Sequence, residues 1–271
     1  MTFSKACEYL GAAGIENCRF EAEILIESLF GECDGAYEYD DRILKEALDR
    51  RVGGYPLQYI IGKWWFWNCE FDLDESCLIP RPDTEIIVDK AIHMLPQGAV
   101  FADLCTGSGC IAISVLHSRP DMSADAYDLF EQTARMAKYN AEKNHVSDRV
   151  KVYVGDVKSG NLLGEKKYQA IISNPPYIRR DVIKTLGREV LHEPAVALDG
   201  GIDGLDFYRA IMDNFSGNLT ESGFFLFEIG YDQATDIKGL AEERGYLCEI
   251  FKDFGGNDRA AVITRTHFKK N

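Results

Sequence analysis

Apolar residues in the first 52 positions recur at the spacing of an amphipathic helix. They stand three or four residues apart on both sides of a glycine-containing break at 31–35: Ala22, Leu25, Ile26 and Leu29 before it, and Ile43, Leu44 and Leu48 after it. Such spacing gathers apolar side chains on one face of each helix, and that face needs a partner to cover it. Residues 1–52 are therefore predicted to form a small helical domain.

After residue 52 the pattern changes to short runs of β-prone residues. Glycines and a proline at 53–56 interrupt the helical period, and the runs 59–61, 64–67 and 69–73 follow, separated by turn residues. We predict a connecting β-hairpin within residues 53–79. The aromatic run Trp64–Trp67 is expected to be hairpin core rather than a binding surface, since alternate residues of a strand face opposite sides.

From residue 80 to 271, strand-like and helix-like segments alternate. Asp83 is expected to cap a helix that runs to about residue 95. Strands are predicted at 100–104, 124–128, 150–154, 170–173 and 224–229, and helices from about 109 and at 130–144, 205–218 and 231–243. Two final runs, 246–251 and 260–264, predict a hairpin and hence an antiparallel sheet edge. This order predicts an α/β domain.

Composition and charge limit the classes of partner. Hydrophobic residues make up 46% of the chain and charged residues 27%, which are values of a globular protein. Lys and Arg total 30 against 44 Asp and Glu, a formal charge of −14, and residues 1–75 alone carry −9 (7 against 16). Such a field repels a phosphate backbone, so stable nucleic-acid binding is disfavoured and a partner of the amino-terminal quarter is expected to be basic.

The sequence carries no signal for a membrane or an oxidising compartment. No apolar run approaches the length of a membrane span, and the first residues lack the basic and apolar regions of an export signal. Eight cysteines are scattered without a C-x-x-C pair, which indicates reduced thiols. We therefore expect a cytoplasmic monomer without membrane contact or a bound metal.

A glycine-rich turn follows the first predicted strand of the α/β domain. The sequence D-L-C-T-G-S-G, Asp103 to Gly109, leads directly into a helix. Glycines at such a junction let the backbone approach a ligand closely, and the N–H groups of the helix start favour anions or carboxylates. The spacing is not G-x-G-x-x-G, and a turn of this kind alone can be merely structural.

Two acidic residues extend this candidate site. Asp128 ends the next strand, where a carboxylate can accept both hydroxyls of a ribose; it can also cap the following helix, and the two roles do not exclude each other. Asp156 follows the third strand, where it either receives the exocyclic amine of a base or only forms a turn. Together with Asp103 and the glycines, these positions predict a nucleoside ligand.

The segment N-P-P-Y, Asn174 to Tyr177, follows the strand at 170–173. Its two prolines end the strand and hold their neighbours in a rigid, extended geometry. The side-chain oxygen of Asn174 and the main-chain oxygen of Pro175 are two acceptors suited to both hydrogens of a planar NH2 group, on which Tyr177 can stack. With both hydrogens bound in this way, the lone pair of the NH2 nitrogen points toward an electrophile at the glycine-rich turn, which favours N-methyl transfer.

With these motifs the large domain resembles the Rossmann-like S-adenosylmethionine-dependent methyltransferases. More narrowly, the whole chain resembles the release-factor glutamine methyltransferase family (HemK/PrmC) in L-I-P-R-P-D-T-E (78–85), S-N-P-P-Y-I (173–178), E-P-x-x-A-L (193–198) and D-F-G-G-N-D-R (253–259). Amino-methyltransferases of DNA and RNA share N-P-P-Y, so the narrower assignment depends on I-P-R-P-D-T-E. The resemblance implies a seven-stranded sheet with an antiparallel last strand, behind a helical domain and a hairpin.

The same resemblance implies methylation of the side-chain amide nitrogen (N5) of the glutamine in the Gly-Gly-Gln loop of peptide chain release factors. The methyl donor is then S-adenosylmethionine and the product S-adenosylhomocysteine. Cofactor contacts are expected from Asp103, Cys105, Thr106, Gly107, Ser108, Gly109, Asp128, Asp156, Val157 and Asn174. Catalysis and substrate binding are expected from Asn174, Pro175, Pro176 and Tyr177, with Arg81 and Glu193 as further substrate contacts.

The chain departs from the family pattern at two positions. The family usually has glycine where this chain has Cys105, whose side chain must point away from the cofactor or reshape the edge of its site. Many members carry an aromatic residue at the position of Val157, so adenine stacking is expected to be thinner here. Arg81 is expected to pair with a carboxylate, either that of the cofactor or, as a structural ion pair, that of a capping glutamate such as Glu85.

Three other functions fit some of these motifs. A nucleic-acid adenine-N6 methyltransferase uses N-P-P-Y on a flipped base, but it needs a basic groove that a charge of −14 does not supply. A dehydrogenase would need G-x-G-x-x-G, which this chain lacks. A nonenzymatic nucleoside-binding module would leave the N-P-P-Y segment without a role. For a release-factor substrate, the acidic helical domain, with Glu21, Glu23, Glu27 and Glu32, is expected to be the docking arm.

Overall fold

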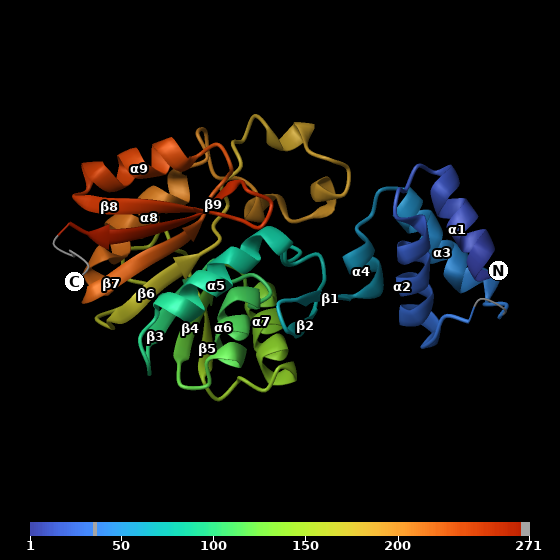
Figure 1. Ribbon diagram of the computed structural model, residues 1–271, viewed down its shortest axis with the longest axis horizontal. Coiled ribbons are helices and arrows are strands. Elements are labelled where there is room, and N and C mark those ends of the chain that lie inside the picture. The colour runs from blue at the N-terminus through green and yellow to red at the C-terminus, as the bar shows by residue number, and fades with distance from the viewer. Residues whose placement is uncertain (35–36, 267–271) are drawn as a thin grey trace.

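The computed structural model describes residues 1–34 and 37–266 and has two lobes joined by a narrow neck (Figure 1). The described residues of the smaller lobe form four helices: α1 (Phe3–Ala12), α2 (Cys18–Phe30), α3 (Asp41–Val52) and α4 (Leu57–Ile61). Their apolar faces meet in a separate core, in which Leu10 of α1, Leu25 of α2 and Leu48 of α3 are fully buried. The predicted helical segment is thus present, and it continues past residue 52 because Leu57 of α4 belongs to the same core.

The strand predicted at residues 59–61 is wrong, since these residues lie in α4. Pro56 stands at the amino-terminal cap of this helix, and Gly62 ends it in the left-handed conformation, with φ +73°. Leu57 and Tyr59 are buried. The packing of this turn between the lobes therefore outweighs the β propensity of the run.

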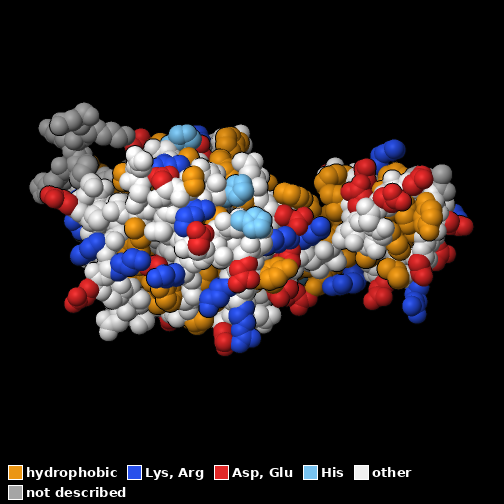
Figure 2. Space-filling model, turned by 90° about the horizontal axis from the view of Figure 1, so that it is seen from below, with side chains coloured by type: hydrophobic (Ala, Val, Ile, Leu, Met, Phe, Trp, Pro, Cys, Tyr) orange, Lys and Arg blue, Asp and Glu red, His pale blue; other side chains and the backbone are white. Residues whose placement is uncertain are grey.

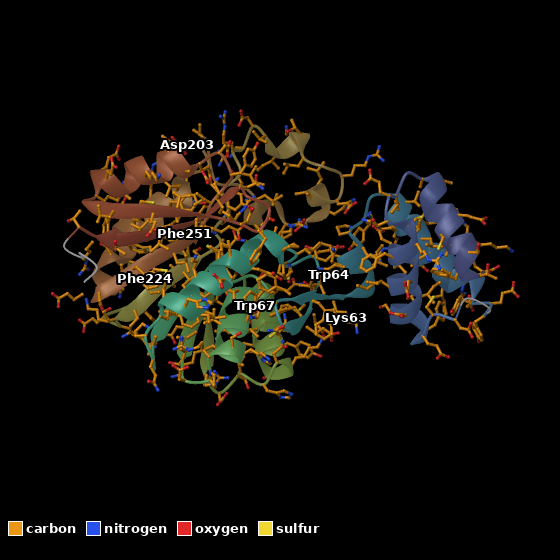
Figure 3. The ribbon with its side chains drawn as sticks, viewed as in Figure 1. Lys63, Trp64, Trp67, Asp203, Phe224 and Phe251 are labelled. Atoms are coloured by element: carbon orange, nitrogen blue, oxygen red, sulfur yellow. The ribbon has the colours of Figure 1, made fainter. Side chains whose placement is uncertain are left out.

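A two-stranded hairpin forms the neck. Antiparallel β1 (Lys63–Phe66) and β2 (Cys69–Asp72) pair directly, as predicted. Trp64 packs against the cores of both lobes, and Figure 3 shows it at the neck, with Trp67 further toward the large lobe. The aromatic run is only partly core, because Phe66 is 3% exposed but Trp65 is 66% exposed.

The larger lobe is a seven-stranded sheet in the order β5-β4-β3-β6-β7-β9-β8. The strands are β3 (Val100–Leu104), β4 (Ser123–Asp128), β5 (Val150–Val154), β6 (Tyr168–Ser173), β7 (Leu219–Glu228), β8 (Tyr246–Lys252) and β9 (Asp258–Arg265). Neighbouring strands from β5 to β7 are parallel, whereas β9 is antiparallel to both β7 and β8. The predicted α/β class and the antiparallel last strand are confirmed.

Helices cover both faces of this sheet (Figure 1). Helices α5 (Glu85–Met94), α6 (Cys110–Ser118) and α7 (Glu131–Lys143) pack on one face, and α8 (Asp206–Phe215) and α9 (Ala234–Glu243) pack on the other. Short 3-10 turns are η1 (Pro82–Thr84), η2 (Ile183–Thr185), η3 (Val190–His192), η4 (Ala195–Ala197) and η5 (Ser216–Asn218). The result is a three-layer sandwich, with the sheet between two layers of helices.

Asp83 does not cap the helix at 85–94, so that prediction is wrong. The 3-10 turn η1 precedes α5, and no side chain caps the start of α5. Asp83 instead pairs with Arg259 of β9, with 3.2 Å between the guanidinium nitrogen and the carboxylate oxygen. The residue therefore joins two segments that are far apart in the sequence.

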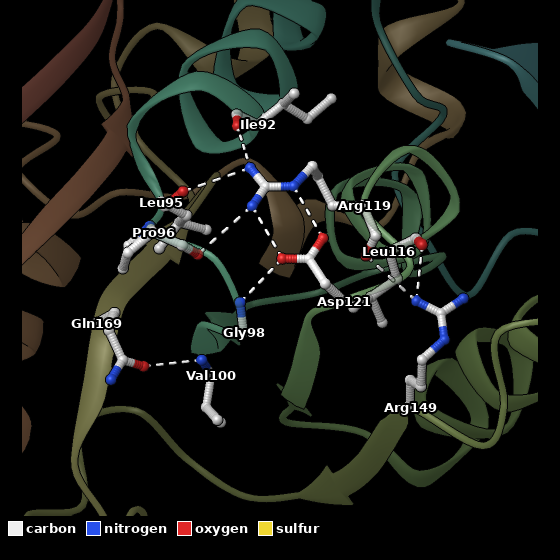
Figure 4. A network of polar contacts seen from close by, with 10 residues as sticks. All are labelled: Ile92, Leu95, Pro96, Gly98, Val100, Leu116, Arg119, Asp121, Arg149 and Gln169. Atoms are coloured by element: carbon white, nitrogen blue, oxygen red, sulfur yellow. Dashed lines mark hydrogen bonds and ion pairs between the residues drawn. The ribbon is translucent and has the colours of Figure 1, made fainter.

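Arg119 joins the end of α5 to the segment that leads into β3 (Figure 4). Its guanidinium donates to the main-chain oxygens of Ile92 at 2.6 Å and Leu95 at 3.3 Å, at the end of α5. It also binds Asp121 at 3.0 Å, and this carboxylate accepts from the N–H of Gly98. These contacts satisfy carbonyls at a helix end and lie at the opposite end of the strands from the site described below.

Asn140 of α7 connects the hairpin to the glycine-rich turn. Its side chain is fully buried and makes three hydrogen bonds. The side-chain oxygen accepts from the N–H of Asp72 at 2.8 Å, and the side-chain nitrogen donates to the main-chain oxygens of Asp72 and Ser108, both at 3.0 Å. One side chain thus fixes β2 and residue 108 relative to α7.

We expect Asn140→Ala to lower the free energy of unfolding by about 2–4 kcal/mol, because it leaves buried main-chain donors and acceptors without partners. Urea unfolding followed by circular dichroism measures the change. Lys138→Ala is the matched control, since Lys138 is an exposed residue of the same helix. Equal stability of the two variants would contradict this role of Asn140.

Candidate active site

A cavity opens at the carboxyl ends of β3, β4 and β6. Loops that follow these three strands line it together with residues 76–81, 84, 194, 196 and 197, and it encloses about 840 Å³ including its mouth. A smaller hollow at residues 155–158 shares four of its lining residues, so the two form one elongated site. The strand order reverses between β3 and β6, which is where open parallel sheets bind ligands.

Three residues of the glycine-rich turn have a positive φ: Cys105 (60°), Gly107 (57°) and Gly109 (84°). Glycine adopts this conformation freely, whereas a side chain with a Cβ pays about 1–2 kcal/mol for it. The glycine usual in the family at the position of Cys105 therefore matches the backbone here. Cys105 lines both parts of the cavity, so the shape of the wall depends on this departure.

Asp103 lies beneath the turn and is not among the residues that line the cavity. Its carboxylate is fully buried and accepts from the hydroxyl of Thr106 at 2.6 Å and from the N–H of Ala112 at 3.2 Å. Burial raises its pKa to about 7, although these two donors lower it. Asp103 therefore shapes the turn from below, while Thr106, Gly107 and Ser108 face the cavity.

Asp128 lies at the junction of both parts of the cavity. One carboxylate oxygen accepts from the N–H of Gly107 at 3.0 Å and the other from the N–H of Phe130 at 3.3 Å. The residue does not cap α7, because Phe130 occupies that position and no side chain caps the helix. Burial raises the pKa of Asp128, and the surrounding N–H groups oppose that shift.

The smaller hollow contains Asp156, Val157 and an aromatic residue that the sequence pattern did not indicate. Asp156 is exposed and accepts from the N–H of Lys158 at 2.8 Å, as a turn former does. Val157 is buried. Phe207, at the start of α8, lines both parts of the cavity, with the Lys158 ammonium 4.3 Å from its ring centre. An aromatic wall is thus present despite the valine.

The N-P-P-Y segment lies partly in the cavity wall. Asn174 and Pro176 line it, whereas Pro175 and Tyr177 do not. The amide nitrogen of Asn174 donates to the hydroxyl of Thr84 at 3.4 Å. Tyr177, expected to stack on a substrate, instead donates its hydroxyl to Glu228 at 3.1 Å.

The backbone of this segment is clamped from behind. Gln233 donates to the main-chain oxygen of Tyr177 at 3.0 Å, and Gly200 and Gly204 pack so closely on Tyr177 that an added Cβ would lie within 3 Å of its main chain. Ile178 pairs with Asp199 in an isolated parallel bridge. The acceptor segment is therefore held in one conformation by residues 198–204.

Arg81 and Glu193, both expected to contact substrate, form an ion pair with each other. Glu193 also accepts from the N–H of Ile79 at 3.0 Å and is 5% exposed. Burial raises its pKa, and Arg81 opposes the shift. The alternative of a structural ion pair with a glutamate is thus present, but the partner is not Glu85, which accepts from the N–H of Trp67. Arg81 lines the cavity and Glu193 does not, so the pair joins the wall to residues 193–197.

Patches of acidic side chains lie on the helical lobe, among apolar and a few basic ones (Figure 2). Glu23, Glu27 and Glu32 are exposed. Glu21, expected to be free for docking, is instead bound by Arg51 of α3, which also pairs with Glu189 at 2.9 Å. Glu21 therefore serves the packing of the lobe.

Three further observations concern membrane helices, metal sites and disulfides. No helix among the described residues is long and apolar enough to cross a membrane. Within residues 1–34 and 37–266, no group of three or more His, Cys, Asp or Glu side chains is arranged to hold a metal ion. All eight cysteines are free thiols.

Solved structures share this fold. The catalytic domain of hMettl16, in complex with MAT2A 3′UTR hairpin 6, aligns with a TM-score of 0.58 and 18% identity over 75% of this chain and 77% of that one. A methyltransferase from Pyrococcus furiosus aligns with a TM-score of 0.56 and 17% identity, over 83% of this chain and 98% of that one. At these identities the likeness establishes the fold alone.

Sequence relatives are more specific. Residues 84–201 match the family model described as "Methyltransferase small domain". The release factor glutamine methyltransferase of Thermodesulfovibrio yellowstonii is 37% identical over 229 residues, covering 82% of this chain and 81% of that protein. That of Moorella thermoacetica is 35% identical over 281 aligned positions, covering 96% of both. The chain therefore belongs to the release factor glutamine methyltransferase family.

Proposed function

We propose that this protein transfers a methyl group from S-adenosylmethionine to the side-chain amide nitrogen of the glutamine in the Gly-Gly-Gln loop of a peptide chain release factor. One observation carries the proposal: Asn174 and Pro176 line the same cavity as the turn at 105–108 and Asp128. Acceptor and cofactor groups therefore share one enclosed space. Relatives that cover most of the chain bear the name of this activity.

The cavity residues fit S-adenosylmethionine. Gly107 leaves open space where a Cβ would be, so a ligand can reach the backbone there. Ser108 lines the cavity, and its buried hydroxyl has no hydrogen-bond partner among the described residues. Val157 and Phe207 give the far end apolar walls suited to a flat base. When bound, the cofactor supplies an electrophilic methyl group on a positively charged sulfur.

Asp128 is the residue that would receive the ribose. Its carboxylate oxygens each accept one main-chain N–H and retain further lone pairs for hydroxyl groups. Because Gly107 and Phe130 hold it from both sides, the carboxylate is oriented before a ligand binds. This preorganisation reduces the ordering cost of binding.

Asn174 orients the glutamine amide. Since its own nitrogen donates to Thr84, its side-chain oxygen is the atom left for the substrate NH2 group. Accepting from that group draws electron density onto the substrate nitrogen and aligns its lone pair for methyl transfer. The nitrogen gives up one proton in exchange for the methyl group. Asp128 is the one carboxylate among the residues described as lining the larger cavity, and its free lone pairs are assigned above to the ribose, so we expect that proton to leave to water.

The rival function, adenine-N6 methylation of nucleic acid, is not favoured. The relatives bear the name of a protein methyltransferase, and the chain carries a formal charge of −14. The exposed acidic residues Glu23, Glu27 and Glu32 of the helical lobe suit docking of a basic protein surface instead. The eight free thiols suit a cytoplasmic enzyme, and we propose that it acts as a monomer without stable nucleic-acid binding.

Incubation with methyl-labelled S-adenosylmethionine tests the function. We expect label on an intact release factor, and none on the same factor with its loop glutamine changed to alanine, on DNA or on tRNA, because the named relatives methylate a glutamine and a charge of −14 disfavours nucleic acid. Label on nucleic acid, or label that survives the glutamine change, would contradict the proposal.

Asn174→Ala should lower kcat by about 10²–10³-fold, as the loss of an acceptor in a preorganised site does. The Kd for the cofactor, measured by calorimetry, should change less than about threefold, because the oxygen matters most in the transition state. Asn161→Ala is the matched control, since Asn161 is exposed and lies outside both parts of the cavity. Weak cofactor binding with normal turnover would refute the assigned role.

Cys105→Gly should tighten cofactor binding about threefold to tenfold, or roughly 0.6–1.4 kcal/mol. The change opens the wall shared by both parts of the cavity and relieves the left-handed conformation. Cys105→Ala, which retains the Cβ, should gain less. Weaker binding by the glycine variant than by the natural protein would show that the thiol contributes to the site.

A further inference from the structure

Four segments far apart in the sequence meet around one buried carboxylate, that of Glu228. The residue ends β7 next to the acceptor segment, because Ser173 pairs with Phe227 in the parallel register of β6 and β7. Glu228 is 1% exposed and does not line the cavity. The proposed function so far gives it no role.

The two carboxylate oxygens of Glu228 have different surroundings. Oε1 accepts from the hydroxyl of Tyr177 at 3.1 Å. Oε2 is buried and has no hydrogen-bond partner among the residues that the structure describes. The hydroxyl of Thr84 lies near enough to lower the pKa of this carboxyl group. A proton donor thus stands beside an acceptor that needs one.

Arg259 and Asp83 are the charged residues that act on the carboxyl group of Glu228. Arg259 pairs with Asp253 and with Asp83, each at 3.2 Å, and its positive charge lowers the pKa of Glu228. The segments D-F-G-G-N-D-R and I-P-R-P-D-T-E therefore join beside the N-P-P-Y tyrosine.

Hydrogen-bond direction links Glu228 to the cavity. Thr84 accepts from the amide nitrogen of Asn174 at 3.4 Å, so its own proton is free to be donated elsewhere. An ionised carboxylate only accepts. When Thr84 donates to Glu228, the Asn174 nitrogen must face Thr84, and the Asn174 oxygen is left to face the cavity.

We propose that Glu228 is a positioning residue, whose ionised carboxylate sets the direction of the hydrogen bonds from Asn174 through Thr84 and so holds the Asn174 oxygen toward the acceptor amide. This inference rests on the proposed function of Asn174. A neutral Glu228 can donate to Thr84, whose proton then goes to the Asn174 oxygen. The Asn174 nitrogen would then turn to the cavity, where it meets the NH2 group of the substrate without an acceptor.

The direction of the pH effect follows from the surroundings of Glu228. Burial raises its pKa to about 7, against the lowering effects of Thr84, Arg259 and Tyr177, and Asp83 raises it further. The other titratable groups coupled to it are the hydroxyl of Tyr208 on α8 and the thiol of Cys110 on α6. Because burial favours the neutral acid, the carboxylate forms only as the pH rises through about 7. Turnover should rise over the same interval.

Glu228→Gln tests the proposal in the full-length enzyme, with an intact release factor as substrate. The amide of the variant can donate to Thr84 at every pH, so kcat should fall about 10–100-fold and its rise between about pH 6 and 8 should disappear. The Kd for the cofactor should stay within about twofold. Thr84→Val should reproduce the loss of kcat, and Thr84→Ser should restore it.

Tyr208→Phe is the structural control, because the Tyr208 hydroxyl donates to the main-chain oxygen of Glu228 at 2.8 Å and not to its carboxylate. This variant should lose stability but keep the kcat and pH profile of the natural enzyme. A folded Glu228→Gln enzyme with unchanged kcat and pH profile overturns the inference, as does full activity of Thr84→Val. Failure of the unsubstituted enzyme to methylate the loop glutamine would instead refute the proposed function.

Discussion

The site depends above all on the pairing of β3 with β6. In this parallel register Leu104 lies opposite Ser173, and the hydroxyl of Ser173 donates to the main-chain oxygen of Leu104 at 2.6 Å. The next residues along the two strands are Cys105 and Asn174, so the glycine-rich turn and the N-P-P-Y segment start side by side. Since a shift by one residue reverses every side chain, the cavity exists only in this register.

Buried polar groups then convert this placement into fixed geometry. Asp103 holds the turn from below and Glu228 lies behind the acceptor segment, each almost fully buried with a pKa raised to about 7. Burying a carboxyl group destabilises the fold relative to an apolar side chain in the same place. Asp103 lies under one loop of the cavity and Glu228 behind the other, so the cost of their burial serves to orient these loops.

Much of this could be predicted from the sequence, because it is local. Strand and helix periods, the glycine turn and N-P-P-Y each occupy one short segment. Pairings between distant residues carry no such signal: Arg81 binds Glu193 rather than Glu85, and Asp83 binds Arg259 rather than the helix that follows it. Phe207 was missed for the same reason, since its place in the cavity depends on how α8 packs.

The central claim is that a methyl group reaches the nitrogen of a glutamine side chain across the junction of β3 and β6. Nuclear magnetic resonance of a release factor methylated with carbon-13 methyl donor tests this claim directly, because it identifies the atom bonded to the new methyl group. The account predicts a methyl group coupled to one side-chain amide N–H, that of the glutamine in the Gly-Gly-Gln loop. A methyl signal attached to any other atom of the factor would contradict it.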